Sequence, residues 1–442
     1  MDEKVVRLGE RTSPVVLDVD VVVVGGGSAG LAAALTAARM GARTALVERY
    51  GFFGGNAVSA WVGTVCGLYR TTAEGFDLVC RGFAEAWTEE LKAAGAGFGP
   101  IPYKETAVLI YVPWAFKRQA DRWVSAEPNL TPLLHANVTE VVRRGRTVEA
   151  VIVGSKRGPL AITGRVFVDA SGDADLAFHA GCRVESGGPG QRQFPSMQFL
   201  MHNVDVQAAY AAGLDRLNEL LATEGQTPEW DLSRSGGAVL PTFRQGEVLG
   251  AMTRIGVEGH SPDMTDLFEA TAAEIAGRAE AEKAGRFLVK YMPGFENAFL
   301  TDTPTQLGVR ETRRAMGDYV LTGEDVLGAG RFDDAVACGA WPQEFHVDGK
   351  ETQWRWLEPG AYYQVPYRSL VAAEVDNVLL AGRCMSATHE ALASTRVIAP
   401  SMAQGEAAGV GAAIAAQKGL AARAVDVAEV QRILRERGAF LG

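Results

Sequence analysis

Residues 19–30 read VDVVVVGGGSAG, a run of valines that passes directly into a glycine-rich turn. The run at 19–24 is typical of a short strand that is buried on both faces. Residues 31–40 are rich in alanine and stop before Gly41, which predicts a helix with a glycine cap. A second strand is expected at 44–47. Residues 21–38 carry no charge, but the three glycines among them argue against a membrane helix.

This strand–turn–helix–strand unit predicts a dinucleotide-binding site. Gly25 permits the tight turn, Gly27 lets the backbone approach a pyrophosphate, and Gly30 lets the helix pack closely on the strand. The free N–H groups and the dipole at the helix N-terminus favour phosphate. Glu48 ends the second strand, where an acid can bind both ribose hydroxyls. The expected phosphate site comprises Gly25, Gly27, Ser28, Ala29 and Gly30. This unit alone does not separate NAD from FAD.

Three further segments point to FAD by resemblance. They read RYGFFGGNA at 49–57, VFVDASGD at 166–173, and VLLAGR at 378–383, the last followed by PSMAQGEAAG at 400–409. Together with the first unit they resemble the FAD-dependent oxidoreductases, stand-alone flavoproteins related to the fumarate reductase, succinate dehydrogenase and glutathione reductase superfamilies. The resemblance implies FAD as the cofactor.

The resemblance also implies which further residues contact FAD. The 49–57 segment would run along the pyrophosphate towards the flavin, and Val138 would lie beside the adenine. The helix N-terminus near Ser401 would face the pyrimidine edge of the flavin and supply positive potential there. The implied contacts beyond the first unit are Arg49, Gly54, Gly55, Asn56, Ala57, Val138, Ala170, Ser171, Gly172, Asp173, Gly382, Arg383 and Ser401.

The expected fold class is α/β, with a Rossmann-like FAD-binding domain of the glutathione reductase type and a second α+β substrate or capping domain. The FAD-binding domain would be discontinuous, formed by residues 1–70, 130–189 and 360–442. Residues 71–129 are expected to form a largely helical insertion or cap, with a helix near 116–123. Residues 190–359 would form the capping domain, with a charged helix near 266–290. In the 130–189 part, strands are expected at 137–142 and 150–153. Residues 187–190 are a candidate hinge. No second GxGxxG follows a strand, so a separate nicotinamide domain is not expected.

His389 is the first candidate for an acid or base, because it lies between the last FAD strand and the flavin-facing helix. The segment loosely resembles the fumarate reductase stretch in which a His and then an Arg contact a substrate carboxylate, and Arg396 would be that arginine. Glu390 could orient His389 or act as a base. The alternative is that His389 only forms a hydrogen bond with the backbone in a buried loop.

Other charged and reactive residues have a structural explanation as well as a functional one. The 310–314 segment, RETRR, is better explained as an interdomain salt-bridge network. Tyr367 and Arg368 either line the site or serve packing and surface charge. Cys66 could be a reactive or flavin-linking thiol, but a small buried residue is the default. His179 is a weaker candidate for a covalent flavin link. The histidine spacing predicts no metal site.

Composition limits the partners. The 442 residues carry a formal net charge of -10, which argues against nucleic acid and anionic membranes as partners. Five scattered cysteines without a CxxC pair argue against a local iron–sulfur or zinc site and fit a reducing compartment. The first residues lack the pattern of a signal peptide, so a soluble cytoplasmic protein is expected.

The sequence therefore predicts transfer of a hydride between a small organic substrate and N5 of the flavin, with oxygen, a quinone or a protein as electron acceptor. Two alternatives stay open: a flavin-dependent monooxygenase, and a flavin-binding electron-transfer partner within a complex. RNA modification conflicts with the negative charge and the lack of a basic stretch.

Overall fold

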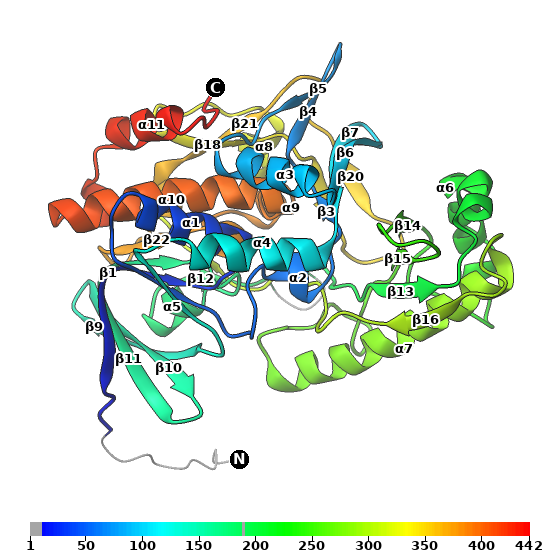
Figure 1. The fold of residues 1–442 in the computed structure, drawn as a ribbon, viewed down its shortest axis with the longest axis horizontal. Helices are drawn as coiled ribbons and strands as arrows, with labels where there is room; N and C mark the ends of the chain where they lie inside the picture. Colours follow the sequence, from blue (N-terminus) through cyan, green and yellow to red (C-terminus); the bar gives the residue numbers. More distant parts are fainter. Residues whose placement is uncertain (1–10, 188–190) are drawn as a thin grey trace.

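The computed structural model describes residues 11–187 and 191–442, and it is a mixed α/β structure built on one large sheet (Figure 1). The seven strands of this sheet run in the order β8 (Leu130–Leu133), β2 (Thr44–Val47), β1 (Val15–Val24), β11 (Gly158–Asp169), β10 (Thr147–Ser155) and β9 (Asn137–Arg144), with β22 (Val378–Leu380) beside the end of β11. Strands β8, β2, β1, β11 and β22 are parallel, whereas β10 and β9 are antiparallel. The three segments expected to share the FAD-binding domain supply all seven strands.

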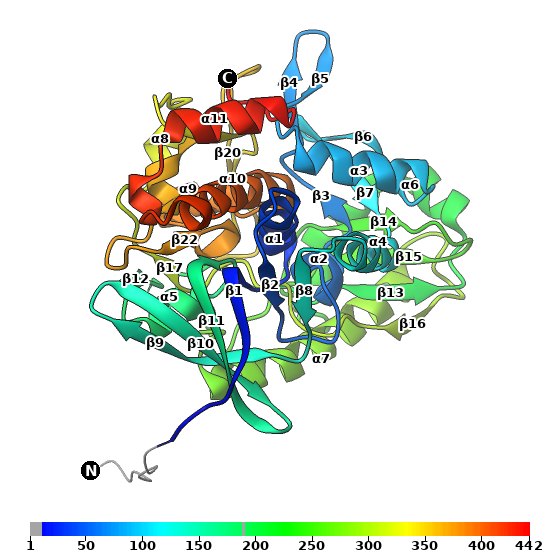
Figure 2. The ribbon, with the colours of Figure 1, turned by 60° about the vertical axis from the view of Figure 1, so that its left-hand side comes forward.

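Two helices, α1 (Ser28–Arg39) and α10 (Ile398–Lys418), lie side by side over the parallel strands (Figures 1 and 2). Their backbones touch because α10 carries glycines at the crossing. A Cβ on Gly405 would lie 2.1 Å from the carbonyl oxygen of Ala29, and one on Gly409 would lie 2.5 Å from that of Ala33. This contact fixes the N-termini of both helices at the carboxyl end of the parallel strands.

The expected strand–turn–helix–strand unit is confirmed as β1, α1 and β2. The strands expected at 137–142 and 150–153 form parts of β9 and β10. The helix expected near 116–123 is α4 (Pro113–Ser125), and the charged helix expected near 266–290 is α7 (Leu267–Tyr291), which Asp266 caps. The flavin-facing helix begins at Ile398, slightly before the expected position.

The 71–129 segment is less helical than predicted. It holds α3 (Phe83–Ala93) and α4, but also most of the hairpin of β4 (Tyr69–Thr72) and β5 (Gly75–Leu78), and the pair β6 (Gly97–Tyr103) and β7 (Thr106–Tyr111). Every residue of β7 is buried, because this strand lies between β3 (Thr64–Val65) and β6. A short run of buried apolar residues fits a strand as well as a helix, and here tertiary pairing decides for the strand.

A second region lies apart from the large sheet, on the right of Figure 1. Its four strands run in the order β14 (Ala238–Pro241), β15 (Val248–Ala251), β13 (Phe199–His202) and β16 (Phe299–Asp302), and it includes α6 (Val206–Ala222) and α7. This region has its own hydrophobic core, with Phe199, Leu217 and Phe287 fully buried. Of the expected hinge, residues 188–190 lie outside the described residues.

Two smaller strand pairs are β18 (Ala335–Gly339) with β21 (Tyr363–Pro366), which packs against α10, and β19 (Gln343–Phe345) with β20 (Gln353–Arg355). A short helix, α9 (His389–Thr395), precedes α10. Within residues 11–187 and 191–442, no helix has both the length and the apolar character needed to cross a membrane.

Candidate cofactor and active site

One cavity of about 1070 Å³ connects the large sheet with the second region. At one end it is lined by the residues that follow β1, β2 and β11, where parallel strands meet helix N-termini. At the other end it is lined by β6, β19 and the start of α10. A cofactor and a second molecule can therefore share this space.

Gly27 lines the first end of the cavity, at the start of α1. Its φ of -74° is open to any residue, and a Cβ there would meet no atom closer than Gly55 Cα at 3.7 Å. The protein itself therefore does not require glycine at this position. No side chain caps the first turn of α1. Free N–H groups beside a backbone that a ligand can approach closely fit a pyrophosphate.

Glu48 lies at the end of β2 and is almost fully buried. Its Oε2 accepts a hydrogen bond from the Gly26 N–H at 2.7 Å, and its Oε1 accepts one from the Tyr50 N–H at 2.9 Å. Burial raises the pKa of Glu48, although these donors favour the charged form. The carboxylate is thus held at a fixed place beside Val138, where a nucleotide ribose and base fit.

Most of the residues expected to contact FAD line this one cavity. They are Gly25, Gly27, Ser28, Ala29, Glu48, Arg49, Gly55, Asn56, Ala57, Val138, Ala170, Ser171, Gly172, Gly382, Arg383 and Ser401. Gly30 and Gly54 are not among the lining residues. Gly30 instead packs against the turn, because a Cβ there would lie 1.7 Å from the carbonyl oxygen of Gly25.

Asp173 is the third expected residue that does not line the cavity, and its carboxylate binds other side chains of the protein. Its carboxylate accepts hydrogen bonds from Arg49 at 3.1 Å, from Arg383 at 2.9 Å and from the Thr312 hydroxyl at 2.8 Å. Burial alone would raise the pKa of Asp173, but Arg383 and Arg49 hold it below its usual value. Asp173 therefore positions two arginines that do line the cavity.

The N-terminus of α10 also opens on the cavity, through Val397, Ile398 and Ser401. The N-cap residue Val397 makes no side-chain hydrogen bond to this helix, and the positive end of the helix dipole faces the cavity. Of its first N–H groups, that of Ala399 donates to the Cys66 carbonyl at 3.3 Å, and Pro400 has none. This arrangement suits negative charge on a bound group, such as the N1 and O2 region of a reduced flavin.

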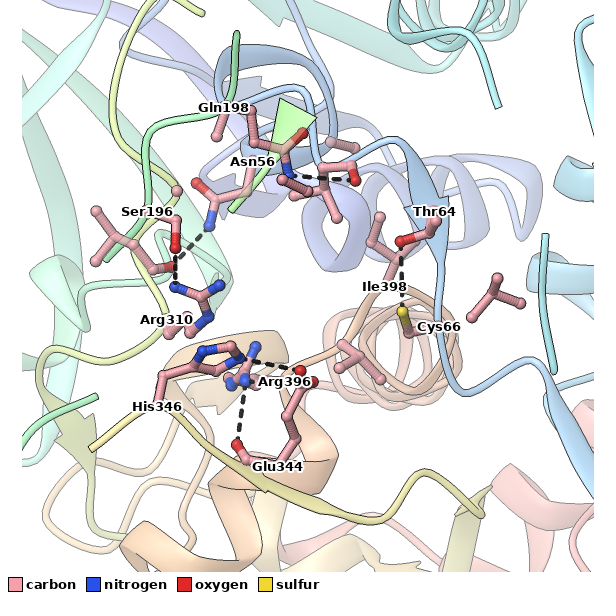
Figure 3. A pocket seen from close by; sticks show the side chains of 18 of the residues that line it. Asn56, Thr64, Cys66, Ser196, Gln198, Arg310, Glu344, His346, Arg396 and Ile398 are labelled. Carbon is pink, nitrogen blue, oxygen red and sulfur yellow. Dashed lines mark hydrogen bonds and ion pairs between the residues drawn. The ribbon is translucent and has the colours of Figure 1, made fainter. Parts of the chain in front are cut away.

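The far end of the cavity holds a cluster of charged side chains, shown in Figure 3. Glu344 is its centre. Its Oε1 lies 3.0 Å from His346 Nε2, and its Oε2 accepts a hydrogen bond from Trp341 Nε1 at 3.2 Å and lies 3.9 Å from Arg396. Arg396 also donates to Gln193 Oε1 at 3.2 Å.

The environment fixes the charges of the Glu344–His346 pair. Burial opposes the charge of Glu344, but His346, Arg396 and Arg310 hold its pKa well below the usual value. Burial, and then the charge of Arg310, lower the pKa of His346. The imidazole is therefore neutral, and its Nε2 donates to the carboxylate. Nδ1 then carries a lone pair, and it has no hydrogen-bond partner within the described residues.

Arg310 completes the cluster from the 310–314 segment (Figure 3). Its Nη1 donates to the Phe194 carbonyl at 2.8 Å and to Ser196 Oγ at 2.9 Å. The other charged residues of the segment do form ion pairs, Arg314 with Glu311 and Arg313 with Asp175. Within the described residues no carboxylate pairs with Arg310. The salt-bridge interpretation thus fits this segment except at Arg310, which lines the cavity.

Of the three expected catalytic residues, only Arg396 lines the cavity. His389 lies at the start of α9, where its Nδ1 is 2.8 Å from Glu311 Oε2 and its ring stacks on Phe345. Glu390 follows it in the same turn. His389 thus contacts the protein and not the cavity, but its partner is the Glu311 carboxylate rather than the backbone, and it lies on a helix rather than in a loop.

Of the remaining candidates, Cys66 lines the cavity, whereas His179, Tyr367 and Arg368 do not. Cys66 lines the cavity beside Thr64, and burial raises the pKa of its thiol to about 12, so the thiol stays neutral. His179 does not line the cavity. The hydroxyl of Tyr367 donates to the Ala422 carbonyl, and Arg368 pairs with Asp334 at 2.9 Å. Both of these residues serve the fold.

Glu344 and His346 were missed by the sequence analysis, which considered His346 only as a metal ligand. One signal was present, since Glu344 lies on strand β19 and His346, two residues later, directly follows the last residue of that strand. Alternate residues of a strand share a face, so their side chains meet. Nothing in the sequence showed that this face lines the cofactor cavity.

Comparison with known proteins agrees with this geometry. The model of the FAD dependent oxidoreductase family matches residues 20–434. No curated protein matches the chain. Among solved structures, GidA from Aquifex aeolicus is similar with a TM-score of 0.50 at 14% identity, covering 91% of this chain and 64% of that one.

Two further solved structures are more distant. A geranylgeranyl bacteriochlorophyll reductase-like protein from Thermoplasma acidophilum has a TM-score of 0.48 at 13% identity, over 95% of this chain and 84% of that one. The p-nitrophenol 4-monooxygenase from Pseudomonas putida has a TM-score of 0.43 at 11% identity, over 96% and 87%.

Proposed function

We propose that this chain, which belongs to the family of FAD dependent oxidoreductases, transfers a hydride between a small organic substrate and N5 of FAD. The flavin supplies the two-electron chemistry when it is bound, and the protein supplies binding, orientation and proton transfer. The observation that carries the proposal is the single cavity, which joins a phosphate-binding helix end to a buried acid–base cluster.

The residues of the first end are suited to hold FAD. We assign the pyrophosphate to the start of α1 at Gly27, Ser28 and Ala29, the ribose to Glu48, and the adenine to Val138. The start of α10 at Ser401 would face the flavin. This assignment implies a glutathione reductase type of FAD-binding domain formed by residues 1–70, 130–189 and 360–442, with the 71–129 insertion and the 190–359 capping domain closing the far end.

His346 is the proposed proton partner in place of His389. When a substrate such as an alcohol or an amine is oxidised, Nδ1 of His346 would accept its O–H or N–H proton, and bound FAD would accept the hydride from its C–H bond. Glu344 fixes the ring by accepting from Nε2, and it stabilises the imidazolium that forms. In the reverse direction the same imidazolium donates the proton. We assign His389 to positioning, through its contact with Glu311.

The acceptor, the compartment and the partners remain proposals. Oxygen, a quinone or a protein would reoxidise the flavin. All five cysteines are free, which suits the proposed cytoplasmic compartment. A small molecule is the proposed substrate, and neither nucleic acid nor a membrane is a proposed partner. A monooxygenase and an electron-transfer partner are the competing functions.

Anaerobic stopped-flow absorption near about 450 nm, a flavin band, tests the proposal. The purified protein is mixed with a library of alcohols, amines and organic acids, and separately with NADH and NADPH. Bleaching by a library compound supports an autonomous dehydrogenase or oxidase. Bleaching only by a reduced nicotinamide would favour a reductase or a monooxygenase. No bleaching by any of them would favour an electron-transfer partner.

A further inference from the structure

The far end of the cavity, which holds the Glu344 cluster, carries more positive than negative buried charge. Three arginines line it, Arg234, Arg310 and Arg396. One carboxylate, Glu344, attracts all three guanidinium groups, and Glu311 attracts Arg396 more weakly. The Glu344 carboxylate already accepts from His346 and Trp341. The protein alone therefore leaves positive charge in this part of the cavity without a counter-charge.

The hydrogen-bond donors of this cluster are also incompletely used. The Arg396 side chain is 10% exposed, and its Nε has no partner within the described part of the chain. The same holds for Nε of Arg234. Among the described residues, Arg310 donates only to neutral oxygens, those of Phe194 and Ser196. Unpaired buried cations are costly unless a ligand supplies the missing negative charge.

The wall beside the arginines is apolar and aromatic. Trp341 and Trp354 are in edge contact at 6.1 Å between ring centroids, and Tyr103 contacts Trp354 at the same distance. Val108 and Ile101 belong to the same small hydrophobic cluster. All five residues line the cavity. A ligand whose anionic group reaches the arginines must therefore place its remaining atoms against aromatic and aliphatic surface.

We infer that the substrate is an aromatic carboxylate, whose carboxylate group binds Arg310 and Arg396 and whose ring packs against Trp341, Trp354 and Tyr103. This inference rests on the proposed function, since it names the substrate class of that site. A planar guanidinium donates two parallel hydrogen bonds to a carboxylate, which favours this anion over a halide or an isolated polar group. The pyrophosphate of FAD does not supply the missing charge, because its proposed site lies at the start of α1.

Isothermal titration of the FAD-loaded, oxidised protein tests the inference. The probes are benzoate, phenylacetate and 3-phenylpropionate, each beside its uncharged amide, together with phenyl phosphate. Hydrogen bonds to a charged group contribute about 1.5–3 kcal/mol, so at least one carboxylate should bind about 10–100 times more tightly than its amide. Arg310→Gln and Arg396→Gln should each remove most of that preference, and Arg310→Lys should restore part of it. Arg144→Gln, on the exposed end of β9, is the control and should change nothing.

The outcomes separate this inference from the proposed function. Equal affinity of every acid and its amide, or no binding of any carboxylate, overturns the inference, while FAD content and flavin bleaching still test the function. A preference for phenyl phosphate over every carboxylate also overturns it, in favour of a phosphate ester. If Arg310→Gln lost its FAD, the acid-to-amide ratio of the FAD-loaded Arg310→Lys and Arg396→Gln variants would decide. If the wild type held no FAD, the function would fail, and the same ratio would then be read on the FAD-free protein.

Discussion

At the residue scale, Gly27 differs from the glycines that the packing of the protein requires, because only a ligand would need glycine at this position. Gly30 and Gly405 are required by neighbouring backbone atoms, whereas a side chain at Gly27 would project towards open cavity space. The strand–turn–helix pattern alone predicted this position, because a glycine-rich turn between a buried strand and a helix is a local feature of the chain.

Replacement of Gly27 by valine should reduce the FAD bound per chain at least about tenfold, because the side chain fills the space assigned to the pyrophosphate. Without FAD the unfolding free energy should fall by only about 1 kcal/mol, since valine starts a helix less well than glycine. FAD content after gel filtration and urea unfolding of the FAD-free protein measure both. An unchanged FAD content would refute the phosphate assignment.

His346 and His389 give a matched pair of variants. His346→Gln keeps a donor for Glu344 but removes the base, so flavin reduction should slow by about 10²- to 10⁴-fold. His389→Asn keeps a donor for Glu311, so the rate should stay within a few-fold of the wild type. The assay is anaerobic flavin bleaching with any compound that reduces the wild-type protein. A slow His389→Asn protein beside an unaffected His346→Gln protein would restore the role predicted from the sequence.

The lowered pKa of His346 makes a prediction about stability and pH. In the unfolded chain this histidine takes up a proton below about pH 6.5, but in the folded protein burial and Arg310 keep it neutral. Its contribution to stability is thus complete above pH 6.5 and is lost as the pH falls. Between pH 7.5 and 5.5 the wild type should lose roughly 1 kcal/mol more unfolding free energy than His346→Gln. Equal losses in urea titrations would show that His346 is protonated in the folded state.

At the element scale, the close crossing of α1 and α10 aligns two helix N-termini on one cavity. The helices and strands themselves were largely predictable, since β1, α1, β2 and α7 follow clear periodic patterns and caps. The strand pair β6 and β7 was not, because a short apolar run does not reveal whether it pairs with another strand.

Substitution of Gly405 by alanine should test the helix crossing. Its Cβ would lie 2.1 Å from the Ala29 carbonyl oxygen, so the helices must separate. The expected cost is about 1–3 kcal/mol of unfolding free energy, with weaker FAD binding because Ala29 belongs to the phosphate turn. Gly285→Ala is the matched control: it lies within α7, and the nearest contact of its Cβ would be Leu300 Cδ1 at 3.4 Å, an ordinary distance. There alanine should be neutral or stabilising by up to about 1 kcal/mol. Equal effects of the two substitutions in urea unfolding would contradict the close crossing.

At the scale of the whole molecule, the cavity unites residues that are far apart in the sequence. The cofactor end follows motifs with a local pattern, and so its residues could be named from the sequence. The far end combines side chains from three segments of the chain: Arg310, the pair Glu344 and His346, and Arg396. Their proximity depends on how the second region packs against the large sheet, and no local pattern encodes that packing. Resemblance pointed to Arg396 and His389, but tertiary contacts place only Arg396 at the cavity.

The central claim is that one cavity holds the flavin and the acid–base cluster together. The most direct measurement is a crystal structure of the FAD-loaded protein. We expect the pyrophosphate at the start of α1, the ribose at Glu48, and the flavin ring between the start of α10 and the Arg310–Arg396–His346 cluster. A flavin ring bound away from that cluster, or FAD bound outside this cavity, would contradict the account.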